Sequence, residues 1–62
     1  MEVYKFIVEG YFSHIGIIVK DKNIKVQSDS YENAQKVAID IMCFRYDLNR
    51  EDCHIITGEI IS

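Results

Sequence analysis

The sequence predicts an α+β fold in which one helix covers one face of an antiparallel β-sheet of three to four strands, a two-layer sandwich with the element order β-β-β-α-β. Three observations predict this fold. Apolar residues recur at helical spacing between Asp29 and Asn49. Short runs rich in β-branched and aromatic residues precede and follow that stretch. A chain of 62 residues has room for one domain, so we expect residues 1–62 to fold as a single unit.

The first strand is expected over residues 3–9, where it ends at Gly10 or continues through Tyr11 and Phe12. One face of this strand is apolar and should join the core: Tyr4, Phe6, Val8 and Phe12. The other face mixes polar and apolar side chains and can face water: Val3, Lys5, Ile7, Glu9 and Tyr11.

The second strand is expected over residues 15–19, after a turn at Ser13 and His14. Three of its apolar side chains are in phase: Ile15, Ile17 and Val19. Gly16 inside the run predicts a bulge or the close approach of another backbone.

Residues 21–23, of sequence Asp-Lys-Asn, have the chemistry of a turn. Residues 24–27 then alternate as a third strand, with Ile24 and Val26 directed inward. The polar side chains of Lys25 and Gln27 are typical of an edge strand, because they discourage pairing with another chain.

The helix is expected to begin after Asp29 or Ser30, since either side chain can accept from the free N–H groups of the first turn. Glu32 follows Asp29 at the spacing of a capping box. One apolar stripe should face the sheet: Ala34, Val37, Ala38, Ile41, Phe44 and Leu48. Ile41 in this stripe and Phe6 in the sheet are expected to be core residues. A return loop over residues 49–52 leads to the last strand, residues 53–61.

The composition disfavours several classes of function. The net charge is −3, and the seven Lys and Arg are scattered along the chain, so no basic stripe is expected to bind nucleic acid. No apolar run is long enough to span a bilayer, so no membrane partner is expected. Cys43 and Cys53 follow no signal peptide, which favours free thiols and a cytoplasmic protein, in the host cytoplasm if the chain is phage-encoded.

The sequence also carries no expected metal, cofactor or catalytic site. His14, His54, Cys43 and Cys53 lack the close pairing that prepares half of a zinc site, such as C-x-x-C. Cys53 and His54 are neighbours on a strand and should point to opposite faces, so they do not form a catalytic dyad. No glycine-rich phosphate loop is present. We therefore expect a protein that is not an enzyme.

A second apolar strip lies on the flank of the expected helix and consists of Ile39, Met42 and Tyr46. One helix does not bury two faces against one sheet, so the strip either wraps over a sheet edge as core or meets another protein. Arg45 could reach a carboxylate such as Glu9 or Glu59, or anchor an interface. The expected partner-binding residues are Tyr11, Tyr31, Ile39, Asp40, Met42, Arg45, Tyr46 and Asp47.

The N-terminal residues Met1-Glu2-Val3, then Lys5, then Gly10-Tyr11-Phe12, resemble the opening of the small Dmd antitoxins of T-even phages. The resemblance covers about a fifth of the chain and carries over no binding residue. It implies a phage-encoded protein that inhibits a host ribonuclease toxin by binding it. The hypothesis from sequence is therefore a small acidic protein that occludes a host defence nuclease or toxin. The alternative is a structural homo-oligomeric accessory protein, and in either case a homodimer is possible.

Overall fold

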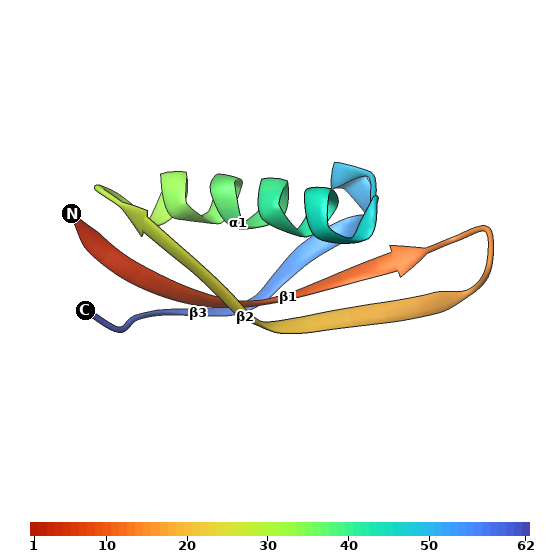
Figure 1. Cartoon of the computed structure of the whole chain (residues 1–62), viewed down its shortest axis with the longest axis horizontal. Coiled ribbons are helices and arrows are strands. Elements are labelled where there is room, and N and C mark those ends of the chain that lie inside the picture. Colours follow the sequence, from red (N-terminus) through yellow and green to blue (C-terminus); the bar gives the residue numbers. More distant parts are fainter.

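A computed structural model describes all 62 residues and confirms the α+β fold. Two strands, β1 (Glu2–Phe12) and β2 (Ile17–Ser28), precede helix α1 (Tyr31–Tyr46). A short 3-10 turn, η1 (Arg50–Asp52), leads to the last strand, β3 (Cys53–Ile60). The sheet order is β2-β1-β3 with both pairings antiparallel, and α1 lies along one face of the sheet (Figure 1).

The expected turn at residues 21–23 is wrong, because these residues lie inside one continuous strand. The two strands expected over 15–19 and 24–27 are parts of β2, so two strands rather than three precede the helix. Between Phe6 and Val8 of β1, β2 contains one extra residue and forms a bulge at Lys22 and Asn23. The polar sequence that predicted a turn supplies a bulge instead.

β3 contains a bulge at the same level of the sheet. Val8 pairs with Ile55 while Ile7 pairs with Thr57, which leaves Ile56 as the extra residue. Both neighbours of β1 therefore bulge beside Ile7, and bulges strengthen the local twist of a sheet. In Figure 1 the strands cross one another near their middle, as strong twist requires.

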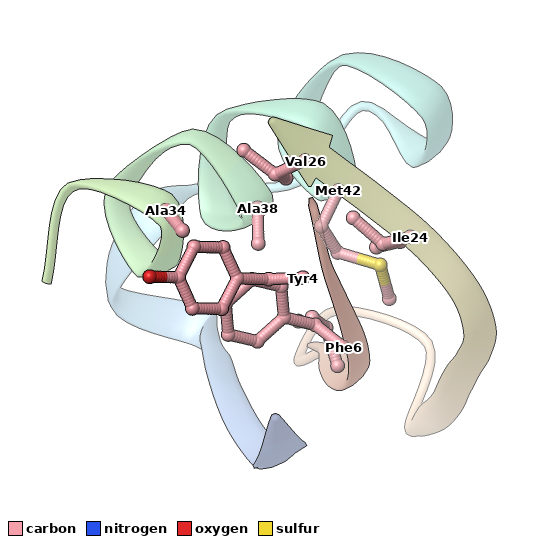
Figure 2. Packing of buried hydrophobic residues seen from close by; sticks show 8 residues of the cluster. Tyr4, Phe6, Ile24, Val26, Ala34, Ala38 and Met42 are labelled. Atoms are coloured by element: carbon pink, nitrogen blue, oxygen red, sulfur yellow. The ribbon is translucent and has the colours of Figure 1, made fainter. Parts of the chain in front are cut away.

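The core lies between α1 and the sheet (Figure 2). The sheet contributes core residues that the alternation predicts: Tyr4, Phe6, Val8, Ile24 and Val26. Phe12, also predicted on this face, is only partly buried. The helix contributes Ala34, Ala38 and Met42. The two alanines let the helix axis lie close to the sheet, and the long side chain of Met42 extends from the helix into the core beside Ile24 (Figure 2).

The helix begins where its cap predicts but is rotated relative to the expected stripe. Ser30, rather than Asp29, caps it by accepting a hydrogen bond from the Asn33 N–H at 3.1 Å. Phe44, expected to face the sheet, is 90% exposed. Val37 is exposed as well, and Ile41 is only partly buried, so the expected stripe is wrong at its outer positions.

The buried face of the helix is centred on the alanines and Met42 because two small residues and one flexible residue allow closer packing than Val37 and Phe44 would. The flank strip of Ile39, Met42 and Tyr46 therefore turns toward the sheet. The question that the sequence left open is decided for Met42, which is core.

Candidate protein-binding surface

The tip of the β1–β2 hairpin projects beyond the end of the helix (Figure 1). We refer to residues 11–18 as the arm. Its strands pair Tyr11 with Ile18 and Phe12 with Ile17, and four residues form the turn. The helix does not extend over the arm, so apolar side chains of the arm are exposed to solvent (Figure 1). These side chains are Tyr11, Ile15, Ile17 and Ile18.

The turn of the arm is well defined by backbone hydrogen bonds. The Phe12 C=O accepts from the N–H groups of Ile15 (3.2 Å) and Gly16 (2.7 Å). Gly16 has a φ of 70°, a left-handed conformation that glycine adopts without steric cost. The glycine thus serves the turn, not the bulge or close approach that the sequence predicted, and Ile15 lies in the turn, not in a strand.

A polar cluster holds the base of the arm against the helix. Asp21 follows the arm on β2 and is 9% exposed. Its Oδ2 accepts from the Arg45 guanidinium at 2.9 Å and from the Tyr46 hydroxyl at 2.8 Å, while Oδ1 accepts from the Asn23 N–H at 2.9 Å. The β2 bulge makes this possible, since it places Asp21 and Ile24, three residues apart, on the same face of the strand.

These contacts favour the ionised form of Asp21. Burial alone would raise the pKa of this carboxyl, but the hydrogen bonds from the Asn23 N–H, the Tyr46 hydroxyl and the Arg45 guanidinium, together with the Arg45 charge, outweigh burial and hold the pKa below its ordinary value. The hydrogen bond to Asp21, with burial and the carboxylate charge, raises the pKa of Tyr46. At neutral pH the cluster is therefore an ion pair with a tyrosine donor, and it fixes where the arm leaves the fold.

A shallow hollow of about 50 Å³ lies between the arm and the segment that follows the helix. The arm lines it with four residues, Tyr11, Phe12, Ser13 and His14. The other wall consists of Asp47, Leu48, Asn49 and Asp52. The volume is far below the roughly 300 Å³ of a small-molecule site, so the hollow has room for a group no larger than about one side chain.

Two of the eight expected partner-binding residues, Tyr11 and Asp47, lie together at this end of the molecule as walls of the hollow. Asp47 has a left-handed backbone, with φ of 55°, and ends the helix by donating its N–H to the Cys43 C=O. Nothing in their separation along the chain indicates this proximity. It results from the antiparallel return of β2, after which α1 runs in the same direction as β1, so that the two elements end at the same end of the molecule (Figure 1).

The other six expected residues are not brought together into one surface. Met42 is fully buried, and Ile39 is partly buried against the core. Arg45 and Tyr46 are committed to Asp21, so the expected pairing of Arg45 with Glu9 or Glu59 is wrong. Two residues remain at the surface elsewhere. Asp40 pairs with Arg50, and Tyr31 packs its ring against Tyr4 and Phe6.

The two thiols lie close together although the sequence indicates no pair. The Sγ atoms of Cys43 and Cys53 are 3.9 Å apart, and Cys53 also approaches the Asn49 C=O. Both cysteines are free. Burial, with the hydrogen bond and charge of Cys43, raises the pKa of Cys53 to about 11. No group of three or more His, Cys, Asp and Glu is placed to hold a metal ion.

Sequence reasoning missed the arm isoleucines and Asp21. The apolar run that contains Ile15, Ile17 and Ile18 predicts a strand packed against a core. These residues are exposed because the hairpin is longer than the helix that covers the sheet (Figure 1). Asp21 is hidden in a turn-like cluster of polar residues. One available signal was the unusual position of Arg45 beside the apolar stripe, which requires a carboxylate partner.

Comparison with protein-family models, with curated proteins and with solved structures found no match for the chain. No helix of the structure has the length and apolar character needed to cross a membrane.

Proposed function

We propose that this chain is a binding protein that acts by occluding another protein, with the arm as its main contact. The observation that carries the proposal is the exposure of Tyr11, Ile15, Ile17 and Ile18 within eight residues of a 62-residue chain. Contiguous exposed apolar side chains on a small monomer mark interaction sites, because they have no stabilising role in the free protein. Tyr and large aliphatic side chains are suitable anchors for a partner's pocket.

The expected partner surface is an apolar groove bordered by basic side chains. The arm would enter the groove, while the carboxylates of Asp47 and Asp52 beside the hollow would face the basic border. The net charge of −3 has the sign that would speed association with a basic protein. The ion pair at the base of the arm supports the proposal, because an arm held in place loses less conformational entropy on binding.

A nuclease or a nuclease toxin fits this description, since such proteins bind phosphates with basic surfaces. The N-terminal resemblance to the Dmd antitoxins favours the same class of partner. In its specific form, the proposal is a phage-encoded inhibitor that covers the nucleic-acid site of a host defence nuclease or toxin.

The test is a comparison of three tagged proteins expressed in a bacterial host: the wild type, Ile18→Lys and Phe44→Lys. Both substitutions place a lysine at an exposed apolar position, one on the arm and one on the helix. Proteins that co-purify are identified by mass spectrometry, and a candidate partner is then purified and its Kd measured by calorimetry. Loss of an anchor side chain should weaken binding by about 30-fold or more.

The proposal requires a stoichiometric partner that Phe44→Lys retains and Ile18→Lys loses, and whose nuclease or toxin activity falls when wild-type protein is added. Equal binding of the partner by both variants would show that the arm is not the contact. A partner whose activity is unaffected at saturation would refute occlusion while leaving binding intact.

A further inference from the structure

The sheet has two free edges, and they differ in composition. The β2 edge carries Lys20, Lys22 and Lys25 and contains a bulge within its polar segment, and these features discourage strand pairing. β3 contains no lysine, arginine or proline, and Ile56 and Ile60 are exposed on it. Like β2 it contains a bulge, and its one acidic side chain, Glu59, lies opposite Lys5 of β1. β3 is therefore the less protected edge.

Backbone groups on the outer side of β3 have no strand beside them. Ile61, which follows β3, donates its N–H to the Val3 C=O on β1 at 2.8 Å. Successive residues of a strand direct their backbone groups to opposite sides. The N–H and C=O groups of Ile60 and Gly58 consequently point away from β1 and toward the free edge.

We propose that β3 pairs antiparallel with β3 of a second copy of this chain, around a two-fold axis between Ile56 and Thr57, and so forms a continuous six-stranded sheet. In this register Cys53 of one copy lies opposite Ile60 of the other, Ile55 lies opposite Gly58, and His54 lies opposite Glu59.

The bulge at Ile56 makes this register self-consistent. Cys53, Ile55, Gly58 and Ile60 pair with buried positions of β1 and so share the helix-covered face. The other face carries His54, Thr57 and Glu59. Across the two-fold axis, residues of the helix-covered face therefore lie opposite residues of the same face, and so do residues of the open face. In a strand without the bulge the same axis would place residues of the covered face opposite residues of the open face, because side chains alternate.

Charges on the open face complement one another across the interface. Within one copy Lys20 pairs across the strands with Glu9, and His54 Nε2 lies 3.2 Å from Glu9 Oε1. Lys5 pairs across the strands with Glu59. The dimer places His54 beside Glu59 of the second copy, so basic and acidic groups alternate from Lys20 of one copy to Lys5 of the other, where Lys25 of β2 ends the row beside Lys5. A register centred on Glu59 would instead oppose two carboxylates, which is destabilising.

The dimer would also bury apolar surface that is exposed in the single chain. Ile60 is 59% exposed in the single chain, and the dimer would place it beside Cys53 of the second copy, near the covered side of that sheet. The arms would point to opposite ends of the assembly, because the strands run antiparallel. Dimerisation therefore leaves both arms free and is independent of the proposed inhibitory function.

The first test measures molecular mass by light scattering and sedimentation from about 1 µM to about 1 mM protein. Wild type should be a dimer in this range, and Ile60→Lys should weaken the dimer by at least about tenfold, because it adds a charge to the edge. Ile18→Lys is the matched control, since Ile18 is 60% exposed and lies on the arm. Circular dichroism confirms that both variants are folded. A wild type that stays monomeric, or a dimer that Ile18→Lys and not Ile60→Lys dissociates, would overturn the proposal.

The second test examines the register directly and does not depend on loss of the dimer. Ile60→Cys in a Cys43→Ser background should form a disulfide between positions 60 and 53 of two copies when glutathione disulfide is added, because opposed residues of an antiparallel pair lie within disulfide range. Ile18→Cys in the same background should not form this bond. Peptide mass spectrometry identifies the linked positions. A predominant 60-to-60 bond, or no bond between chains, would refute this register.

Discussion

Replacing Asp21 with Asn tests whether the polar cluster holds the arm to the helix. The substitution keeps the size of the side chain and its oxygen acceptor for the Asn23 N–H, but removes the charge that Arg45 and Tyr46 contact. A hydrogen bond to a charged group contributes about 1.5–3 kcal/mol. The Arg45 side chain is 44% exposed, so solvent screens its ion pair and we assign that pair about 0–1 kcal/mol. The expected loss is therefore about 2 kcal/mol.

A domain of this size has a free energy of unfolding of roughly 3–9 kcal/mol, so a loss of about 2 kcal/mol is readily measured by urea unfolding followed by circular dichroism. Asp40→Asn is the matched control, because Asp40 forms an ion pair with Arg50 in which both side chains are more than half exposed. We expect that control to change stability by less than about 0.5 kcal/mol.

The pH dependence gives a sharper criterion. Asp21 has a lowered pKa in the folded protein, so its contribution is fully present above the ordinary value of 3.8 and is lost as the pH falls through the lowered folded pKa. The difference in stability between wild type and Asp21→Asn should be largest near neutral pH and shrink below pH 3.8. A difference that is the same at pH 7 and well below pH 3.8, or that matches the Asp40→Asn control, would refute the assigned role of the cluster.

Three further predictions concern packing and the thiols. Met42→Ala should cost about 2–5 kcal/mol in urea unfolding, whereas Phe44→Ala should cost less than about 0.5 kcal/mol; similar losses would contradict the helix rotation. Oxidation that links Cys43 to Cys53 should stabilise the fold by roughly 2–3 kcal/mol and raise the Tm, reversibly with reductant, and an unchanged Tm of the oxidised form would contradict their proximity. Gly58→Ala should cost about 1–3 kcal/mol, because its Cβ would lie 2.5 Å from a core ring; full stability would show that this ring moves freely.

The sequence by itself determined the elements whose pattern is local. Alternation along β1 identified Tyr4, Phe6 and Val8 as core, and the Ser30 cap with the periodic residues after it identified the helix. These predictions hold because strand alternation and helix capping depend on neighbours within a few residues.

Only the tertiary structure decided how the polar segment of β2 is used. An Asp-Lys-Asn sequence is compatible with a turn or a bulge, and local energies do not distinguish them. The choice depends on pairing with β1 and on contacts to side chains 24 and 25 residues later in the chain, Arg45 and Tyr46. The same contacts place the arm beyond the helix.

The residues of the candidate site also divide into features that the sequence determines and features that only the tertiary structure decides. Tyr11 and Asp47 were expected at a surface from their residue types, but their shared hollow arises because β2 returns the chain, so that β1 and α1 run in the same direction and end together (Figure 1). The sequence left open whether Met42 is core or interface, because helical periodicity specifies which residues share a face and not which face is buried. That choice depends on how closely the helix can approach the sheet, which Ala34 and Ala38 decide only when the sheet is in place.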